Sequence, residues 1–282
     1  MSFGLIILIS FGERLMSETF CKVILCIKNK DFETALNILK NIEKKSPLSW
    51  HQAYLIGFCL KQLGDIPDSI IYYKKSLSIL PNHPLTLNAM GISYQNMGNL
   101  SQARHHFEES IKLLKVPYFP KWSSYSLMCR TLLSEGLNSL GTVLHLLSEK
   151  QTNKPELKQD ALRSYLEAVR IEGEVLAFKA KNQTRVRSKS SSVDKLKYIS
   201  VIEKELIYNS PNLIIFQVNV AAQLHRNGHE QFAKDYIVRV KEQIDEFHPH
   251  WHLVIELTRN MTLLSHSHSH SHSHSHSHSW YH

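Results

Sequence analysis

Glycine and proline are scarce in this chain, and its apolar stretches are short. The 10 glycines and 9 prolines among 282 residues are too few for a sandwich of many short strands joined by tight turns. The apolar segment at residues 3–11 falls far short of the ~20 residues that span a bilayer. It also lacks the basic start and the small-residue cleavage site of a secretion signal. The composition favours an all-α protein without a membrane span. We expect residues 1–15 to be an apolar N-terminal extension or a partial helix, since Met16 offers an alternative start.

Cysteine is also rare, and motifs typical of catalysis are missing. The four cysteines show neither a C-x-x-C pair nor a disulfide framework, so we interpret them as reduced. This interpretation favours the cytoplasm, with the nucleus as the second option. The sequence contains no G-x-G-x-x-G, P-loop, G-x-S-x-G or H-E-x-x-H motif. We therefore expect a protein that is not an enzyme and holds no cofactor.

A repeat with an offset of 34 residues runs through the first part of the chain. Three frames begin at Met16, Trp50 and Pro84. Equivalent positions in them carry similar residues: position 8 has Val23, Gly57 and Gly91; position 15 has Lys30, Gly64 and Gly98; position 16 has Asp31, Asp65 and Asn99; position 20 has Ala35, Ser69 and Ala103; position 24 has Leu39, Tyr73 and Phe107; position 32 has Pro47 and Pro81.

Each of these positions has a physical role in a pair of helices. Small residues at positions 8 and 20 let the two helices approach closely, and bulky residues at position 24 fill the space between them. Glycine at position 15 ends the first helix, and Asp or Asn at position 16 caps the second. Proline at position 32 stops the second helix. The repeat therefore predicts successive antiparallel helix pairs.

The period, the small residues and the final proline resemble the tetratricopeptide repeat (TPR) family, most clearly from Trp50 to Lys115. The resemblance implies an α-solenoid that binds other proteins. The positions that carry it are Gly57, Gly64, Tyr73, Pro81, Gly91, Gly98, Ala103 and Phe107. The first frame departs from the family at Val23 and Lys30, and the third has Lys115 where the family has proline, so we expect the array to be interrupted there.

The rest of the chain is predicted to be helical but less regular. We expect a TPR array of about three repeats at 16–117, degenerate helical repeats at 118–180, and a basic, Ser-rich linker at 181–197. A helical C-terminal part follows at 198–263, with a TPR-like unit near 214–247. Within 118–180, the spacing of Ala161, Tyr165 and Ala168 matches the second helix of a TPR. A disordered Ser/His tail is predicted at 264–282.

The first helix of each TPR lines the concave face of such a solenoid, which is where partners usually bind. Here that face is apolar and aromatic with an amide rim, which suits a peptide or a partner's helix. The predicted groove residues are Phe20, Ile24, Tyr54, Phe58, Lys61, Asn88, Ile92, Gln95 and Asn96. The Lys, Asn and Arg clamp of chaperone-binding relatives is missing, which disfavours a chaperone C-terminus as the partner. The aromatic residues suit packing within the chain or self-association equally well.

Two low-complexity segments carry the remaining signals. Residues 179–197 supply +6 of the +8 net charge, with seven basic residues against Asp194. We interpret this segment as a solvated linker. The alternative function is a nucleic-acid-associated subunit that contacts RNA through it, but no aromatic residues are interleaved with the basic ones. In the tail, Ser and His alternate from Ser265 to Ser279, which would place every histidine on one side of an extended chain. We predict no metal site there, nor at His248, His250 and His252.

Overall fold

The computed structural model describes residues 18–115, 124–187, 208 and 210–272. All secondary structure in these residues is α-helical, as the sequence predicts. The chain divides into two compact units, residues 1–157 and 158–282. In the described part of the chain, no helix is both long and apolar enough to cross a membrane. The predicted extension at residues 1–15 lies outside the described residues.

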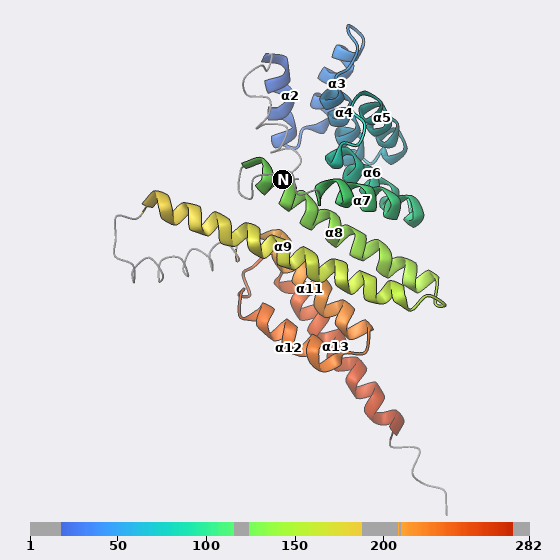
Figure 1. Ribbon diagram of the computed structural model, residues 1–282, viewed down its shortest axis with the longest axis vertical. Helices are drawn as coiled ribbons and strands as arrows, with labels where there is room; N and C mark the ends of the chain where they lie inside the picture. Colours follow the sequence, from blue (N-terminus) through green and yellow to red (C-terminus); the bar gives the residue numbers. More distant parts are fainter. Residues whose placement is uncertain (1–17, 116–123, 188–207, 209, 273–282) are drawn as a thin grey trace, which may run out of the picture. The chain divides into compact units, whose positions relative to one another are not determined.

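The first unit contains three successive helix pairs followed by a longer helix (Figure 1). The pairs are α2 (Glu18–Lys28) with α3 (Phe32–Glu43), α4 (Trp50–Gln62) with α5 (Ile66–Ile79), and α6 (Pro84–Asn96) with α7 (Leu100–Leu114). Each pair contacts the next, and α4 also contacts α6. Helix α8 (Ser124–Lys150) contacts α7 and α6. It therefore takes the place that the first helix of a fourth pair would occupy.

The turn inside each pair has the conformation that the repeat predicts. Lys30, Gly64 and Gly98 have φ angles of 61°, 90° and 74°, in the left-handed region. The N–H of the following residue then donates to the carbonyl five residues earlier, which closes the helix end. These bonds are all 2.9 Å long and join Asp31 to Cys26, Asp65 to Leu60, and Asn99 to Tyr94.

The residue after each turn caps the second helix of the pair. A side-chain oxygen of the cap accepts a hydrogen bond from the backbone N–H three residues on, which satisfies a donor that the helix leaves free. The three bonds are Asp31 with Thr34 (3.2 Å), Asp65 with Asp68 (3.3 Å) and Asn99 with Gln102 (3.2 Å). The same two sequence positions therefore end one helix and begin the next in all three pairs.

Small and large residues alternate across the interface within each pair. Gly57 lies against the ring of Tyr73, and Gly91 lies against the ring of Phe107. In the first pair the equivalent residues are Val23 and Leu39, both fully buried. Here a smaller residue at position 24 accompanies the larger residue at position 8, which accounts for the departure of this frame from the family pattern.

A buried serine in each of the two regular repeats makes a bond that the sequence analysis did not foresee. Ser76 donates from Oγ to the carbonyl of Trp50 at 2.9 Å, and Ser110 donates to the carbonyl of Pro84 at the same distance. Both serines have no exposed surface. Each ties the second helix of a pair to the first turn of its own first helix, where backbone carbonyls border the interface.

The predicted helices after the array form, but the basic linker begins later than predicted. Helix α9 spans Glu156–Arg187, and Ala161, Tyr165 and Ala168 on it are buried. Residues 181–187, which we assigned to the linker, are therefore helical. They contain neither Gly nor Pro, so nothing in them stops the helix. Residues 188–197 lie outside the described residues.

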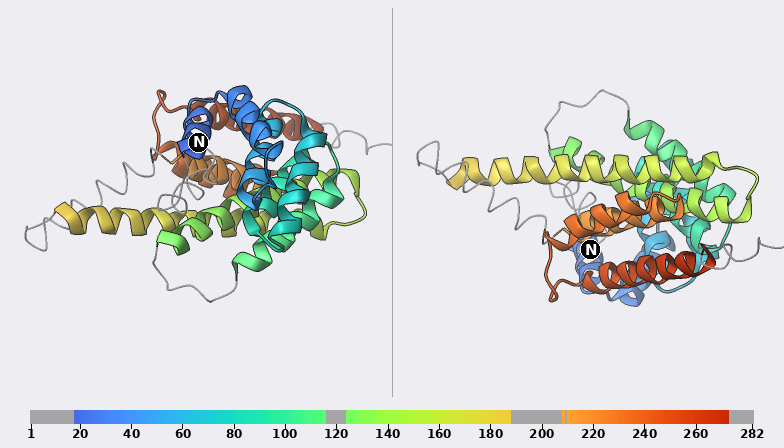
Figure 2. Two further views of the ribbon diagram at one scale, coloured as in Figure 1. Left: turned by 90° about the horizontal axis from the view of Figure 1, so that it is seen from above. Right: turned by 90° about the horizontal axis from the view of Figure 1, so that it is seen from below.

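The second unit ends in three helices that contact one another, namely α11 (Pro211–Arg226), α12 (Glu230–Lys241) and α13 (Trp251–His272) (Figure 2). Gly228, with φ of 82°, forms the same turn as Gly64 and Gly98. Ala221, Ala233, Ile237 and Val240 are buried in the core of these helices. A TPR-like helix pair is therefore present in the region where the sequence predicts one.

The Ser/His tail begins inside a helix. Helix α13 continues through His272, whereas we predicted disorder from residue 264 and argued from an extended chain. Residues 251–272 contain neither Gly nor Pro, so the helix passes into the repeat without a stop signal. Residues 273–282 lie outside the described residues.

Candidate partner-binding groove

The predicted groove residues on α2, α4 and α6 differ widely in exposure. Ile24, Tyr54, Phe58 and Asn88 are buried, with at most 6% of their surface exposed. Phe20, Lys61, Ile92 and Gln95 are half-buried, and Asn96 is exposed. The side chains that a partner would reach are therefore the half-buried and exposed ones. The buried ones form the floor beneath them.

Phe58 forms the aromatic floor of the groove at the second helix pair. Its ring meets Phe32 edge to face, with centroids 6.0 Å apart, and Lys61 Nζ lies 5.6 Å from the ring centroid. Burial lowers the pKa of Lys61, although the carboxylate of Glu135 acts in the opposite direction. The Lys61 ammonium group has therefore lost hydration through burial, and its attraction to Glu135 compensates only part of this loss.

Helix α8 adds a carboxylate to this face. Glu135 influences both Tyr54 and Lys61, which stand seven residues apart on one side of α4. Burial is the main cause that raises the pKa of Tyr54, and the negative charge of Glu135 adds to it. The hydroxyl of Tyr54 therefore stays neutral. The sequence analysis missed Glu135, because it assigned the groove by the 34-residue period, which is lost after Lys115.

Gly136 on α8 lies beside the third helix pair. A Cβ atom at Gly136 would lie 3.4 Å from Oδ1 of Asn88 and 3.5 Å from a side-chain carbon of Ile111. Asn88 Oδ1 is buried without a hydrogen-bond partner among the protein atoms.

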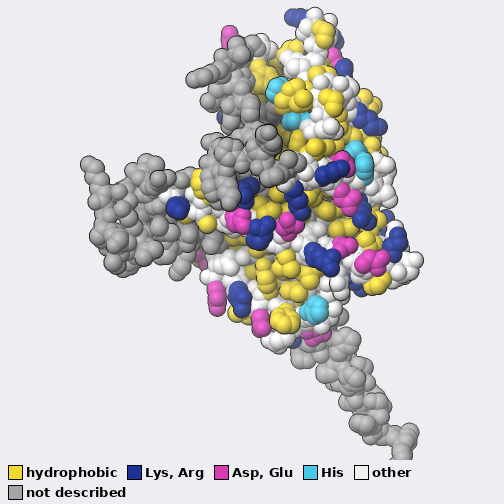
Figure 3. Space-filling model, in the orientation of Figure 1, with side chains coloured by type: hydrophobic (Ala, Val, Ile, Leu, Met, Phe, Trp, Pro, Cys, Tyr) yellow, Lys and Arg dark blue, Asp and Glu magenta, His cyan; other side chains and the backbone are white. Residues whose placement is uncertain are grey.

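Charge is almost absent from the first helices of the two regular repeats. Helix α4 contains one Lys and no Arg, Asp or Glu, and α6 contains none of these residues. On the face of the molecule seen in Figure 3, by contrast, acidic and basic side chains are interspersed over the described surface. The predicted groove therefore differs chemically from this surface: it is apolar and rich in amides, with one cation, Lys61, and the carboxylate of Glu135 near it.

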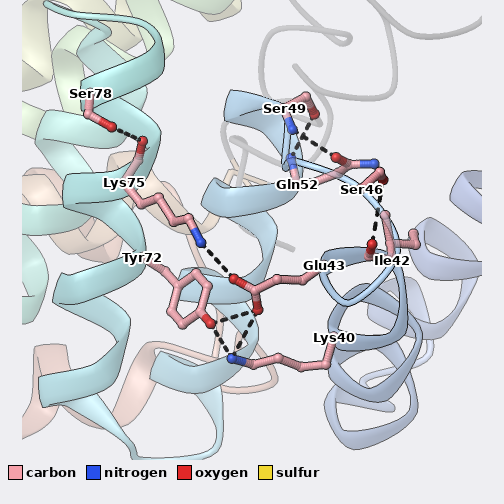
Figure 4. A network of polar contacts seen from close by, with 9 residues as sticks. All are labelled: Lys40, Ile42, Glu43, Ser46, Ser49, Gln52, Tyr72, Lys75 and Ser78. Atoms are coloured by element: carbon pink, nitrogen blue, oxygen red, sulfur yellow. Dashed lines mark hydrogen bonds and ion pairs between the residues drawn. The ribbon is translucent and has the colours of Figure 1, made fainter.

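The polar network on the second helices of the first two pairs has a structural role (Figure 4). Glu43 on α3 accepts hydrogen bonds from Lys75 Nζ at 2.7 Å and from the Tyr72 hydroxyl at 2.8 Å, both on α5. Lys40 donates to the Tyr72 hydroxyl. Opposite charges are paired here, so the cluster offers neither a free base nor a free nucleophile. It links one helix pair to the next.

Metal ligation finds no support in the described residues. They contain no group of three or more His, Cys, Asp or Glu side chains that could hold a metal ion. His248 uses both ring nitrogens in hydrogen bonds, with the Tyr208 carbonyl at 2.7 Å and the His250 N–H at 3.1 Å.

Successive helix pairs and their shared turn chemistry define a helical-repeat protein of the α-solenoid class. Residues 51–115 match the family model of the tetratricopeptide repeat. This part of the chain therefore consists of tetratricopeptide repeats, as the 34-residue repeat predicts. The match covers the two regular repeats, α4 to α7.

One curated relative and several solved structures are similar to this chain. The anaphase-promoting complex subunit 6 of Dictyostelium discoideum is 32% identical over 66 residues, which are 23% of this chain and 8% of that protein. Among solved structures, the assembly chaperone of RpL4 is 14% identical, with a TM-score of 0.48 and coverage of 89% of this chain and 98% of that one. A putative kinesin light chain of Podosopora anserina is 14% identical, with a TM-score of 0.46 and coverage of 80% and 92%.

Proposed function

We propose that this chain is a non-enzymatic scaffold that binds a peptide or a partner's helix in the groove of its first unit. The proposal is carried by the near absence of charge on α4 and α6, which leaves an apolar and amide surface in a chain of which 21% of the residues are charged. Such a surface loses little hydration free energy when a partner covers it, and its amides can bond to the partner's backbone.

Different groove residues would contribute differently. Ile92 offers apolar contact, and Gln95 and Asn96 on the same helix offer hydrogen bonds. Lys61 and Glu135 would receive polar groups of the partner, since both are only half-buried. Tyr54 and Phe58, which we named as groove residues, would act from below as packing.

Gln95→Arg combined with Asn96→Arg tests the proposal, because it adds two charges to a helix that has none. Ser101→Arg combined with His105→Arg is a matched control, since both residues are exposed on α7 of the same helix pair. Circular dichroism should show wild-type helix content for both variants. Affinity purification with quantitative mass spectrometry, with and without nuclease, should show nuclease-resistant partners that only the groove variant loses.

The alternative function, RNA contact through the basic segment, predicts a different outcome. Partners would then be nuclease-sensitive and would disappear when residues 181–197 are deleted. They would remain bound to the Gln95→Arg, Asn96→Arg variant. Partners that remain bound both to the Gln95→Arg, Asn96→Arg variant and to the chain without residues 181–197 would contradict both proposals.

A further inference from the structure

A turn between α12 and α13 holds the most exposed large hydrophobic side chain among the described residues. Phe247 is 83% exposed, compared with 68% for Phe232, the next in rank. Burial of such a side chain is favourable, so this exposure leaves free energy available for binding. A single exposed aromatic is common on mobile loops. Phe247, however, lies in a turn that many hydrogen bonds fix.

His248 fixes one side of this turn. Its side chain is 5% exposed, Nε2 lies 2.7 Å from the carbonyl of Tyr208, and Nδ1 accepts from the backbone N–H of His250 at 3.1 Å. The carbonyl requires a donor and the N–H requires an acceptor, so the ring is the neutral tautomer with its proton on Nε2. The imidazole thus joins the turn to the segment before α11.

Asp245 fixes the other side. One of its carboxylate oxygens, Oδ1, accepts from the Tyr208 hydroxyl at 2.9 Å and from the backbone N–H of Phe247 at 3.1 Å. Backbone bonds from His248 N to the Asp245 carbonyl and from Trp251 N to the His248 carbonyl, 3.1 and 3.0 Å long, complete the turn. The residues on both sides of Phe247 are therefore held in place, and its ring points into solvent from a preorganised support.

The charges around Phe247 are of one sign. Glu242, Asp245 and Glu246 are exposed, and residues 242–250 contain no Lys or Arg. Burial, together with neighbouring His248 and His252, lowers the pKa of His250, so this ring adds no cation at neutral pH. An acidic surface repels nucleic acid and anionic bilayers, which leaves a protein as the binding partner of this aromatic.

We propose that residues 242–250 form an anchor that inserts Phe247 into an apolar pocket of a partner protein whose rim carries Lys or Arg. Exposed aromatics that enter a partner's pocket often dominate the binding energy, and a turn that is already ordered loses little entropy on binding. The three carboxylates steer the basic rim toward the turn. The anchor belongs to the second unit and the groove residues belong to the first, so different variants test the two proposals.

Selection from a phage-displayed library of random dodecapeptides on the immobilised full chain tests the anchor. We expect clones that combine apolar residues with Lys or Arg, that bind Phe247→Ala about tenfold more weakly or worse, and that bind Phe232→Ala as they bind wild type. Glu246→Lys should weaken the same clones, and so should a rise in salt. Phe247→Ala should keep the wild-type melting temperature, since its side chain is in solvent.

Other outcomes overturn the proposal. It fails if every recovered clone binds Phe247→Ala as well as wild type, if no clone is recovered, or if the clones that distinguish Phe247→Ala are rich in acidic residues. Binding of a labelled oligonucleotide or of anionic vesicles that depends on Phe247 would also refute it. Clones that lose binding to the Gln95→Arg, Asn96→Arg variant instead would support the groove and contradict the anchor.

Discussion

Gly57 lies so close to Tyr73 that a Cβ atom on the glycine would stand 2.8 Å from Cε1 of the ring. One repeat later, a Cβ atom on Gly91 would stand 2.7 Å from Cδ1 and Cε1 of Phe107. Both rings are fully buried, so neither can swing aside without disturbing the core. The close packing of α4 on α5 and of α6 on α7 therefore depends on the missing side chains.

Gly57→Ala and Gly91→Ala should each destabilise the first unit by about 1–3 kcal/mol, because a methyl group must displace a buried ring. This loss should exceed the gain of up to about 1 kcal/mol that alanine brings to a helix interior. The midpoint of urea unfolding, followed by circular dichroism, measures the difference.

Gly173→Ala provides the control for these two variants. Gly173 is also helical, on α9, but a Cβ atom there would meet no heavy atom within 4 Å. We expect this variant to be neutral or stabilised by about 0.5–1 kcal/mol through helix propensity alone. If Gly173→Ala lost as much stability as Gly57→Ala, the close contact with Tyr73 would not be the cause.

Lys30→Gly should stabilise the protein. Lys30 has a φ of 61° in the position that Gly64 and Gly98 occupy in the later repeats, and a left-handed conformation costs a residue with a side chain about 1–2 kcal/mol. Its side chain is exposed, so the substitution removes little packing. We expect a gain of about 1 kcal/mol in the free energy of unfolding.

Lys44→Gly is the matched control, because Lys44 is also exposed at a helix end but has a φ of −67°. There glycine relieves no strain and only adds freedom to the unfolded chain, so this variant should lose stability. A gain in both variants, or in neither, would contradict the assignment of strain to Lys30.

The turns and the core of the repeats could be predicted from the sequence because they depend on local chemistry. A left-handed residue followed by Asp or Asn specifies the same turn at residues 30, 64 and 98, and this turn does not depend on how the helices pack afterwards. The pairing of Gly57 with Tyr73 follows from the 34-residue period, which places a small residue at position 8 and a bulky residue at position 24 of the same helix pair. Lys30 kept this turn despite its side chain, because the bonds from Asp31 fix the backbone around it.

The chemistry of the groove could be predicted only in part. Its apolar and amide character was visible in α4 and α6, but burial of Tyr54 and Phe58 depends on tertiary packing that no period encodes. Glu135 comes from α8, a helix outside the 34-residue repeat, so its influence on Lys61 had no local signal. The helical start of the Ser/His tail was missed for a related reason. The alternation of Ser and His was interpreted by itself, without considering that a helix precedes it and can continue into it.

Tyr72→Phe should destabilise the first unit by about 0.5–1.5 kcal/mol, the usual net value of one hydrogen bond. The hydroxyl that is lost donates to Glu43 at 2.8 Å and also accepts from Lys40. A double-mutant cycle with Glu43→Ala should give a coupling free energy clearly different from zero, because both changes remove the same bond. Additive effects would show that the network of Figure 4 does not act as a unit.

The same network predicts a loss of stability in acid. Burial alone would raise the pKa of Glu43, but hydrogen bonds from Lys75 and Tyr72 and the charge of Lys40 outweigh it and hold the pKa below its usual 4.5. The contribution of Glu43 is therefore complete above pH 4.5 and is lost as the pH falls through the lower folded value. Glu43→Gln should flatten this part of the pH–stability curve, and Glu33→Gln, on an exposed residue of the same helix, should not.

The environment of His83, at the junction between the second and third helix pairs, predicts a second loss of stability at a less acidic pH. Its ring lies 4.2 Å from Trp50, centroid to centroid, and Nδ1 is 2.9 Å from Oγ1 of buried Thr86. Burial, and to a smaller extent His51, lowers the pKa of His83 from 6.5 to about 4. The unfolded chain therefore takes up a proton in this range before the folded chain does, and stability should fall as the pH is lowered from 6.5 toward 4.

The size of this effect follows from the shift in pKa, at about 1.4 kcal/mol for each unit, reduced by the partial exposure of the ring. His83→Asn should be less stable than wild type at pH 7 and should lose less on acidification to pH 5, as urea midpoints at the two values will show. His105→Asn, on an exposed histidine of α7, should keep the wild-type slope. Equal slopes in all three proteins would mean that His83 takes up its proton equally in the folded and unfolded chains, and that the junction at Trp50 is not sensitive to pH.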